Sequence, residues 1–183
     1  MWRFLVRVAV TTFQRGRTAI WFVTRPEALG VHAVVLTPAG KIVLVRQTYT
    51  PGWRLPGGGL KRREAPEAAV AREMREELRL SGFGALHHVC NFEHQPEYRR
   101  GLAALFLMTE AVYDGRPSLE VDAIAEFAPD ALPAEATWLT RKLIAAAVAS
   151  DGWPGWRAPV TAEGAGDPSV RLLPPDLSAF DRS

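Results

Sequence analysis

The stretch PGGGLKRREAPEAAVAREMREELRL, residues 56–80, joins three glycines to a run with the spacing of a helix. Pro66 suits the first helical turn, and the alanines that follow are strong helix formers. At about 100° per residue, Glu73, Glu76 and Glu77 fall within an arc of roughly 100°. The sequence therefore predicts a helix over 66–80 that presents three carboxylates beside a buried apolar stripe.

Three clustered carboxylates repel one another, and the i,i+4 pair Glu73 and Glu77 alone costs a few tenths of a kcal/mol. A solvated charged face is one interpretation. A cleft that holds a divalent cation is the other, because Mg²⁺ is bound by a few carboxylates together with waters and substrate phosphates. Gly57, Gly58 and Gly59 permit close approach of the backbone to a ligand, although neither GxGxxG nor a P-loop is present.

The segments on either side of residues 56–80 predict a mixed sheet between helices, an α/β fold. Residues 31–38 and 41–46 form a hairpin pattern around Ala39-Gly40, and Gly52–Pro56 is typical of a short third strand. The remaining predicted elements are strands in 85–92 and 102–115, a turn at Asp114-Gly115, a strand end with a loop in 126–133, and a second helix over 134–150.

Residues 1–25 are predicted to be an appended amphipathic segment, because Arg3 and Arg7 interrupt its apolar run. It packs on the domain or on a second subunit, as in a homodimer. The alternative is a membrane-surface helix formed by residues 1–24. Residues 151–183 form a tail rich in Pro, Gly and Ala that is loose unless aromatic and apolar side chains anchor it: Trp153, Trp156, Leu172 and Phe180.

The composition indicates a globular protein: 183 residues, 48% hydrophobic and 23% charged, with a net charge of +2. So small a charge gives no case for a nucleic-acid partner. The single cysteine, Cys90, excludes an internal disulfide and favours a reducing, cytoplasmic location. Its apolar neighbours indicate a buried structural thiol rather than a nucleophile.

Residues 58–80 resemble the Nudix box, Gx5Ex7REUxEExGU, in which U is a bulky aliphatic residue. Every fixed position matches except the late glycine, where Arg79 stands; the matching residues are Gly58, Glu64, Arg72, Glu73, Met74, Glu76, Glu77 and Leu80. The wider resemblance runs from about Gly30 to Ser150, which gives a Nudix hydrolase domain of 26–150. It implies an α/β/α sandwich around a mixed β-sheet, with the box as loop, helix and loop.

The resemblance also implies a reaction. Nudix hydrolases use Mg²⁺ or Mn²⁺ to cleave the pyrophosphate bond of a nucleoside diphosphate linked to another group, so the expected substrate is a nucleotide sugar, an ADP-ribose-like compound or a nucleoside triphosphate. The implied metal ligands are Glu73, Glu76, Glu77 and the Gly57 carbonyl. Arg72 would orient the glutamates, and Glu64 and Gly58 would support the loop.

The general base varies within the family, so Glu120, on the loop after the long strand, is the candidate outside the box. Glu93, Glu97 and Glu126 are its rivals. Arg46, Arg54 and Tyr98 are the expected substrate contacts. Pro96 and Tyr98 stand near positions that mark two different substrate classes in relatives, and these two signatures cancel.

Arg79 favours a second interpretation, a catalytically weak Nudix-fold module that binds nucleotides or regulates. The intact Arg72-Glu73 and Glu76-Glu77 pairs favour the enzyme. A glycine in the box normally eases the chain out of the helix in a left-handed conformation. We therefore expect Gly82 to take over this turn, with the helix exit shifted and the three glutamates in place.

Overall fold

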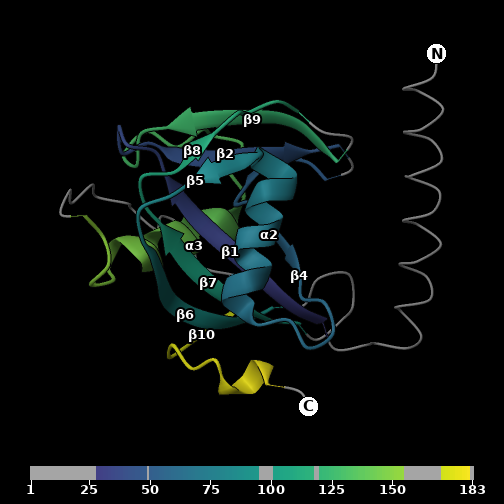
Figure 1. Ribbon diagram of the computed structural model, residues 1–183. Helices are drawn as coiled ribbons and strands as arrows, with labels where there is room; N and C mark the ends of the chain where they lie inside the picture. Colours follow the sequence, from purple (N-terminus) through teal and green to yellow (C-terminus); the bar gives the residue numbers. More distant parts are fainter. Residues whose placement is uncertain (1–27, 49, 95–100, 118–119, 155–169, 182–183) are drawn as a thin grey trace.

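The structure, a computed structural model, describes residues 28–48, 50–94, 101–117, 120–154 and 170–181. The predicted N-terminal segment 1–25 lies outside these residues. Figure 1 shows a sheet with one helix in front and one behind. The strands are β1 (Ala28–Leu36), β2 (Ile42–Gln47), β3 (Trp53–Arg54), β4 (Gly57–Gly59), β5 (Leu80–Gly82), β6 (Leu86–His94), β7 (Gly101–Met108), β8 (Val112–Tyr113), β9 (Val121–Phe127) and β10 (Arg171–Leu173). The helices are α2 (Pro66–Leu78), α3 (Trp138–Val148) and the short 3₁₀ helix η2 (Ser178–Phe180).

The main sheet has the strand order β10-β6-β7-β1-β2-β3, with β4 paired to β1 and β9 paired to β2. The pair β1 and β7 is parallel, whereas the other pairs of this sheet are antiparallel. Strands β5 and β8 form a separate antiparallel pair. The predicted mixed sheet between helices is therefore confirmed.

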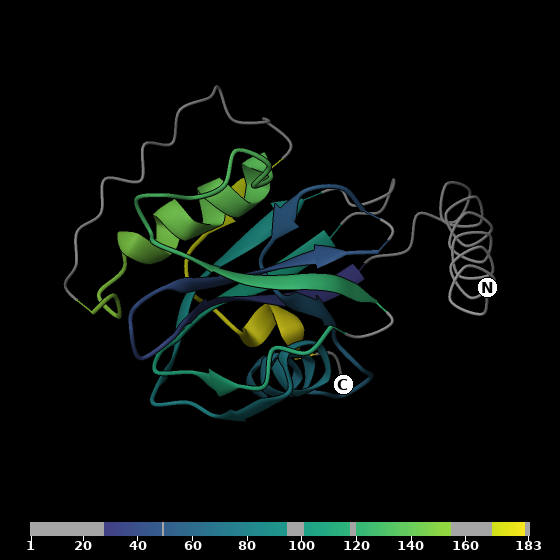
Figure 2. The ribbon, with the colours of Figure 1, turned by 90° about the horizontal axis from the view of Figure 1, so that it is seen from above.

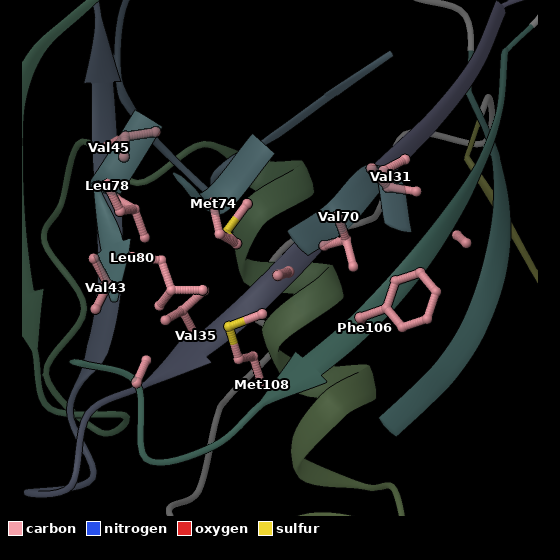
Figure 3. Packing of buried hydrophobic residues seen from close by; sticks show 14 of the residues in the cluster. Val31, Val35, Val43, Val45, Val70, Met74, Leu78, Leu80, Phe106 and Met108 are labelled. Carbon is pink, nitrogen blue, oxygen red and sulfur yellow. The ribbon is translucent and has the colours of Figure 1, made fainter. Parts of the chain in front are cut away.

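Alternation along β1 divides the core between the two faces of the sheet. Val31 and Val35 point toward α2, where Val70 and Met74 complete one buried cluster (Figure 3). Val34 points to the opposite face, which α3 covers with buried side chains that include Leu143 and Ile144. Each helix thus buries one stripe against its own face, and α2 leaves its carboxylate side outside the core.

The hairpin predicted around Ala39-Gly40 is confirmed, because β1 and β2 pair antiparallel and Gly40 has a φ of 70°. The predicted helix over 134–150 begins only at Trp138. Thr137 caps it: its side-chain oxygen accepts a hydrogen bond from the Thr140 N–H at 3.2 Å. The buried strand predicted over 102–115 ends at Met108, and the chain forms β8 further on.

The expected exit of the glutamate helix at Gly82 is wrong. Helix α2 ends at Leu78, and Arg79 itself adopts the left-handed conformation, with φ 56° and ψ 46°. Its N–H donates to the Met74 carbonyl. Gly82 instead lies in β5, which starts directly after Arg79 and buries Leu80. The left-handed conformation costs an L-residue only about 1–2 kcal/mol, which this immediate burial offsets.

Part of the C-terminal tail is docked on the domain. Strand β10 pairs with β6, and the Lys142 ammonium donates to the Val170 carbonyl at 2.8 Å. The segment then crosses from the α3 side to the α2 side of the sheet, where Phe180 is buried (Figure 2). Trp153 is also buried, Leu172 is exposed, and Trp156 lies outside the described residues.

Within the described part of the chain, no helix is both long enough and apolar enough to cross a membrane.

Candidate active site

The glycine loop, Gly57–Gly59, lies between β1 and α2 and contacts both. Strand β4 pairs with β1 so that Gly57 lies opposite His32. A Cβ on Gly57, whose φ is 152°, would stand 2.2 Å from the Val31 carbonyl oxygen. A Cβ on Gly58 would stand 2.5 Å from the carboxylate of Glu73. Only glycine therefore lets this loop lie against both the strand and the first of the clustered glutamates.

Arg72 is the hub of the polar contacts on α2. Its Nε and Nη2 donate to the two oxygens of Glu64 at 2.8 and 2.9 Å, a bidentate pair. Its Nη1 donates to Glu73 at 2.7 Å and to Glu76 at 3.3 Å, and its Nη2 also donates to the Gly59 carbonyl at 3.0 Å. One guanidinium thus holds two of the three clustered glutamates and ties them to the glycine loop.

Glu77 is the most buried of the three glutamates, with 8% of its surface exposed. The Gly57 N–H donates to its Oε2 at 2.9 Å. Burial raises the pKa of Glu77 to about 8, partly opposed by this hydrogen bond and reinforced by the charges of Glu73, Glu120 and Glu76. Burial is thus the main reason why Glu77 holds a proton more readily than an exposed glutamate.

The pKa values of two other carboxylates of the box, Glu64 and Glu73, are shifted in opposite directions. Hydrogen bonds from Arg72 hold the pKa of Glu64 at about 2, so Glu64 is ionised throughout the neutral range. Burial raises the pKa of Glu73 in spite of its contact with Arg72, and the charges of Glu76 and Glu64 add to this shift. Glu64 is the principal partner of the Arg72 guanidinium, and Glu73 is a further one.

Glu120, the candidate base outside the box, is exposed and immediately precedes β9. The Thr48 N–H donates to its carbonyl at 3.0 Å, and its charge contributes to the raised pKa of Glu77. Glu126 accepts from the Tyr113 hydroxyl at 3.0 Å and lies 3.9 Å from the Lys41 ammonium. Glu93 is exposed on β6, and Glu97 lies outside the described residues. Of the described candidates, only Glu120 is among the groups whose charge acts on Glu77.

Of the expected substrate contacts, Arg46 and Arg54 lie on neighbouring strands, β2 and β3. The Arg46 guanidinium stacks over Trp53, 5.5 Å from the ring centre. Trp53 packs with the cluster under α3, on the opposite face of the sheet from α2. Arg54 lies on β3 opposite Val45. Tyr98 and Pro96 lie outside the described residues.

The carboxylates in the second half of α2 fit a divalent cation by their chemistry. Carboxylate oxygens are the donors that Mg²⁺ and Mn²⁺ prefer, and three of them, on Glu73, Glu76 and Glu77, lie within five residues of α2. The side chains are not yet spread for a metal: no group of three or more His, Cys, Asp or Glu among the described residues is arranged to hold one. Arg72 and the Gly57 N–H occupy the carboxylates instead.

Two contacts were not anticipated from the sequence. The Lys61 ammonium lies 3.9 Å from Glu76, and the Lys61 N–H donates to Glu64 at 2.8 Å. The available signal was the run Lys61-Arg62-Arg63, three cations directly before Glu64. How closely these cations approach the glutamates depends on the path of the loop, which residue spacing in the sequence does not determine.

A glycine loop that delivers a carboxylate helix to one face of a mixed sheet, with a second helix on the other face, defines an α/β sandwich of the Nudix type. The chain belongs to the NUDIX family, whose domain model matches residues 26–147.

Individual relatives agree with this assignment. An RNA pyrophosphohydrolase of Hahella chejuensis is 36% identical over 50 residues, which are 27% of this chain and 31% of the relative. A MutT-like protein of Streptomyces ambofaciens is 40% identical over 50 residues, 27% of this chain and 32% of the relative. The matches thus span about a third of the length of these curated relatives.

Solved structures extend the similarity beyond the box. A MutT NUDIX hydrolase from Burkholderia pseudomallei superposes with a TM-score of 0.56 at 27% identity, over 66% of this chain and 97% of that one. A MutT protein from Methanosarcina mazei gives a TM-score of 0.54 at 22% identity, over 66% and 92% of the two chains. The second likeness shows the fold alone.

Proposed function

We propose that the protein is a metal-dependent hydrolase that cleaves the pyrophosphate bond of a nucleoside diphosphate linked to another group. The substrate class includes nucleotide sugars, ADP-ribose-like compounds and nucleoside triphosphates. The observation that supports this most directly is the Arg72 guanidinium, which donates hydrogen bonds to Glu64, Glu73 and Glu76 and also to the Gly59 carbonyl. A charged face with no ligand has no need of such a fixed, glycine-framed carboxylate cluster.

In this proposal Glu73, Glu76, Glu77 and the Gly57 carbonyl hold Mg²⁺ or Mn²⁺. A bound divalent cation neutralises phosphate charge and lowers the pKa of a bound water. Glu64 keeps Arg72 fixed through two hydrogen bonds, and Arg72 in turn aims Glu73 and Glu76. The Gly57 N–H holds one oxygen of Glu77. These contacts keep the glutamates beside the glycine loop, and the carboxylates would turn from their present hydrogen bonds toward the ion when it binds.

The proton of the attacking water goes to a carboxylate in this mechanism. Glu120 is our choice, because it is exposed and acts electrostatically on Glu77 from outside the box. Glu76 is the alternative within the box, since its side chain is 55% exposed. Replacing each in turn by glutamine distinguishes them: loss of the base flattens the acidic limb of the pH–rate profile.

The one sequence feature that favoured a non-catalytic module is accounted for by the structure. Arg79 takes the left-handed conformation that the box glycine would take, and α2 continues through Glu77 to Leu78. The departure from the box pattern therefore leaves the three glutamates on one helix. A buried single thiol, Cys90, supports our placing the protein in a reducing, cytoplasmic compartment.

A substrate screen that measures the release of phosphate-containing products tests this function. Nucleotide sugars, ADP-ribose, dinucleoside polyphosphates and nucleoside triphosphates are incubated with the full chain and Mg²⁺, and with EDTA as the control. We expect turnover of at least one compound, abolished by EDTA and reduced about 100-fold or more in Glu76→Gln. No turnover of any compound, or undiminished turnover in Glu76→Gln, would overturn the proposal.

A further inference from the structure

The C-terminal segment of residues 170–181 is docked on the domain although it lies outside the residues that the NUDIX model matches, 26–147. Strand β10 pairs with β6, and the Asn91 side-chain amide donates to the Asp176 carbonyl. The segment then forms η2, whose Phe180 is only 6% exposed and belongs to the buried cluster under α2. A segment beyond the family match therefore completes the core beneath the glutamate helix.

Phe180 lies beside the turn that leads into α2. Two clefts, of about 290 and 490 Å³, are each lined by Phe180 together with Arg63 and Glu64. Leu60, which directly precedes the turn, packs against the same buried cluster as Phe180. Figure 2 shows η2 next to α2. The turn thus borders hollow space, and Phe180 is part of the wall that it shares with the C-terminal segment.

The turn itself, residues 61–64, needs support from its surroundings. Its third residue, Arg63, has a φ of 61°, a left-handed conformation that is unfavourable for an L-residue. The Glu64 N–H donates to the Lys61 carbonyl at 3.1 Å, which closes the turn. The side chains of Lys61, Arg62 and Arg63 are all exposed, so they do not anchor it in the core. Strained backbone of this kind persists where neighbouring structure holds it, and Phe180 is such a neighbour.

The position of the turn matters because it carries Glu64. The two oxygens of Glu64 accept from the Arg72 guanidinium at 2.8 and 2.9 Å. The same guanidinium donates to Glu73 and Glu76. A shift of the turn would therefore pass through this bidentate pair to the carboxylates proposed to hold the metal. Loss of such an outer contact typically lowers metal affinity or activity by about 10–100-fold.

We propose that Phe180 is a positioning residue: it holds the turn at residues 61–64, so that Glu64 keeps Arg72 directed at Glu73 and Glu76. The inference rests on the proposed function and deepens it, because it adds residues 170–181 to the unit that performs the reaction. Phe180 contacts neither metal nor substrate in this proposal and acts through Glu64 alone. The functional unit is thus larger than the domain that the family model matches.

Hydrogen exchange of the full chain tests the support of the turn without any need for turnover. Phe180→Ala is compared with Leu143→Ala, which also shortens a buried side chain, on the opposite face of the sheet under α3. Peptides that span residues 60–66 are followed at a temperature where thermal melts show both variants folded. We expect exchange there to be about 10-fold faster in Phe180→Ala and changed less than about 2-fold in Leu143→Ala. Equal exchange in the two variants would overturn the proposal. If Phe180→Ala does not fold, Phe180→Leu takes its place, with an expected increase of about 3-fold.

A double-mutant cycle tests whether Phe180 acts through Glu64. The values of kcat and KM with Mg²⁺ are measured for Phe180→Ala, Glu64→Gln and the double variant, on the best substrate of the screen. We expect Phe180→Ala alone to lower kcat about 10-fold and to change KM less than about 2-fold. In the Glu64→Gln background the same substitution should lower kcat less than about 2-fold further, because residues in one network are not additive. Losses that simply multiply, or an equal loss in Leu143→Ala, would contradict a role through Glu64.

A calorimetric titration with Mg²⁺ alone keeps this inference separate from the hydrolase proposal. We expect the Kd for Mg²⁺ to rise about 10-fold in Phe180→Ala and to stay within about 2-fold of the wild type in Leu143→Ala. Faster exchange and weaker Mg²⁺ binding in Phe180→Ala alone, without turnover of any compound, would support the positioning role and refute the hydrolase. Turnover in the screen, with equal exchange and equal Mg²⁺ affinity in both variants, would refute the positioning role and leave the hydrolase standing.

Discussion

The two faces of the sheet are covered by helices of similar length that are fixed in different ways. Helix α3 has its own N-cap, Thr137, and buries an apolar stripe. Helix α2 begins at Ala65 and Pro66 without any side-chain cap and ends in a left-handed arginine. Helix α2 also buries an apolar stripe, and distant hydrogen bonds add to this, from Arg72 to Glu64 and Gly59 and from Gly57 to Glu77. A local cap thus stabilises the start of α3, whereas hydrogen bonds with the glycine loop and with Glu64 fix the position of α2.

Gly58→Ala is expected to have the largest effect, because it breaks the contact of α2 with the loop. The new Cβ would lie 2.5 Å from the Glu73 carboxylate, which must move. Displacing a catalytic group by about 1 Å costs on the order of 100-fold in rate. The measurement is kcat with Mg²⁺ on the best substrate of the screen.

Gly82→Ala is the matched control for this change, because nothing lies within 4 Å of a Cβ there. Its activity should equal that of the wild type. Equal activity of Gly58→Ala and Gly82→Ala would show that the loop does not position Glu73.

Arg72→Gln removes the hub of α2 and should lower kcat about 10–100-fold, the usual effect of losing a group that orients metal ligands. The apparent Mg²⁺ affinity, measured by calorimetry, should fall as well. Arg141→Gln on α3 removes a donor to the Pro133 carbonyl and is the control. A comparable loss of activity in both variants would contradict the difference between the helices.

Acid should destabilise the α3 side of the sheet through His32. Burial, followed by the charge of His94, lowers the pKa of His32 from 6.5 to about 4. The unfolded chain therefore binds a proton between pH 6.5 and 4 that the folded chain does not, so stability falls as pH falls through this window. We expect about 2 kcal/mol of lost stability at pH 5 relative to pH 7.

Urea unfolding at several pH values measures this loss, and His32→Gln should flatten the curve between pH 7 and 5. An unchanged slope in His32→Gln would assign the acid sensitivity to other groups.

Thr137→Ala removes the cap of α3 and should lower the free energy of unfolding by about 1 kcal/mol. Activity should not change, because α3 contributes none of the box residues. The counterpart on the other helix is Ala65→Ser, which adds a cap to α2 and should raise stability by several tenths of a kcal/mol or more. Chemical denaturation of both variants gives the two values, and opposite signs are the expected result.

Arg79→Gly should have the smallest effect, a gain of up to about 1 kcal/mol. Glycine adopts φ 56° without strain, although it also gains entropy in the unfolded chain. The denaturation midpoint measures the net effect of the relieved strain and the added entropy of the unfolded chain. A clear loss of stability would mean that the arginine side chain contributes more than its backbone strain costs.

Much of the site was predictable because it is local in sequence. The box spacing places Arg72 near Glu73 and Glu76 on one helix, and the hairpin at Ala39-Gly40 follows from turn chemistry. The exit at Arg79 was predicted wrongly, since a glycine preference is only a small energy that the burial of Leu80 overrides.

The unpredicted features depend on pairing between distant segments. The closeness of Gly57 to Val31 follows from the register of β1 with β4, and β10 exists only because β6 offers it an edge. Neither register is encoded in a local period. The position of Lys61 beside Glu76 depends in turn on the path of that loop.

Strand β10 has a practical consequence for handling the protein. It pairs along the outer edge of β6, from Arg171 opposite Glu93 to Leu173 opposite Asn91. An uncovered sheet edge is a template for pairing with other chains. A chain that ends at Asp151 would lack the Pro- and Gly-rich end and retain the whole Nudix box. It would still be prone to aggregate, because β10 would no longer cover the outer edge of β6.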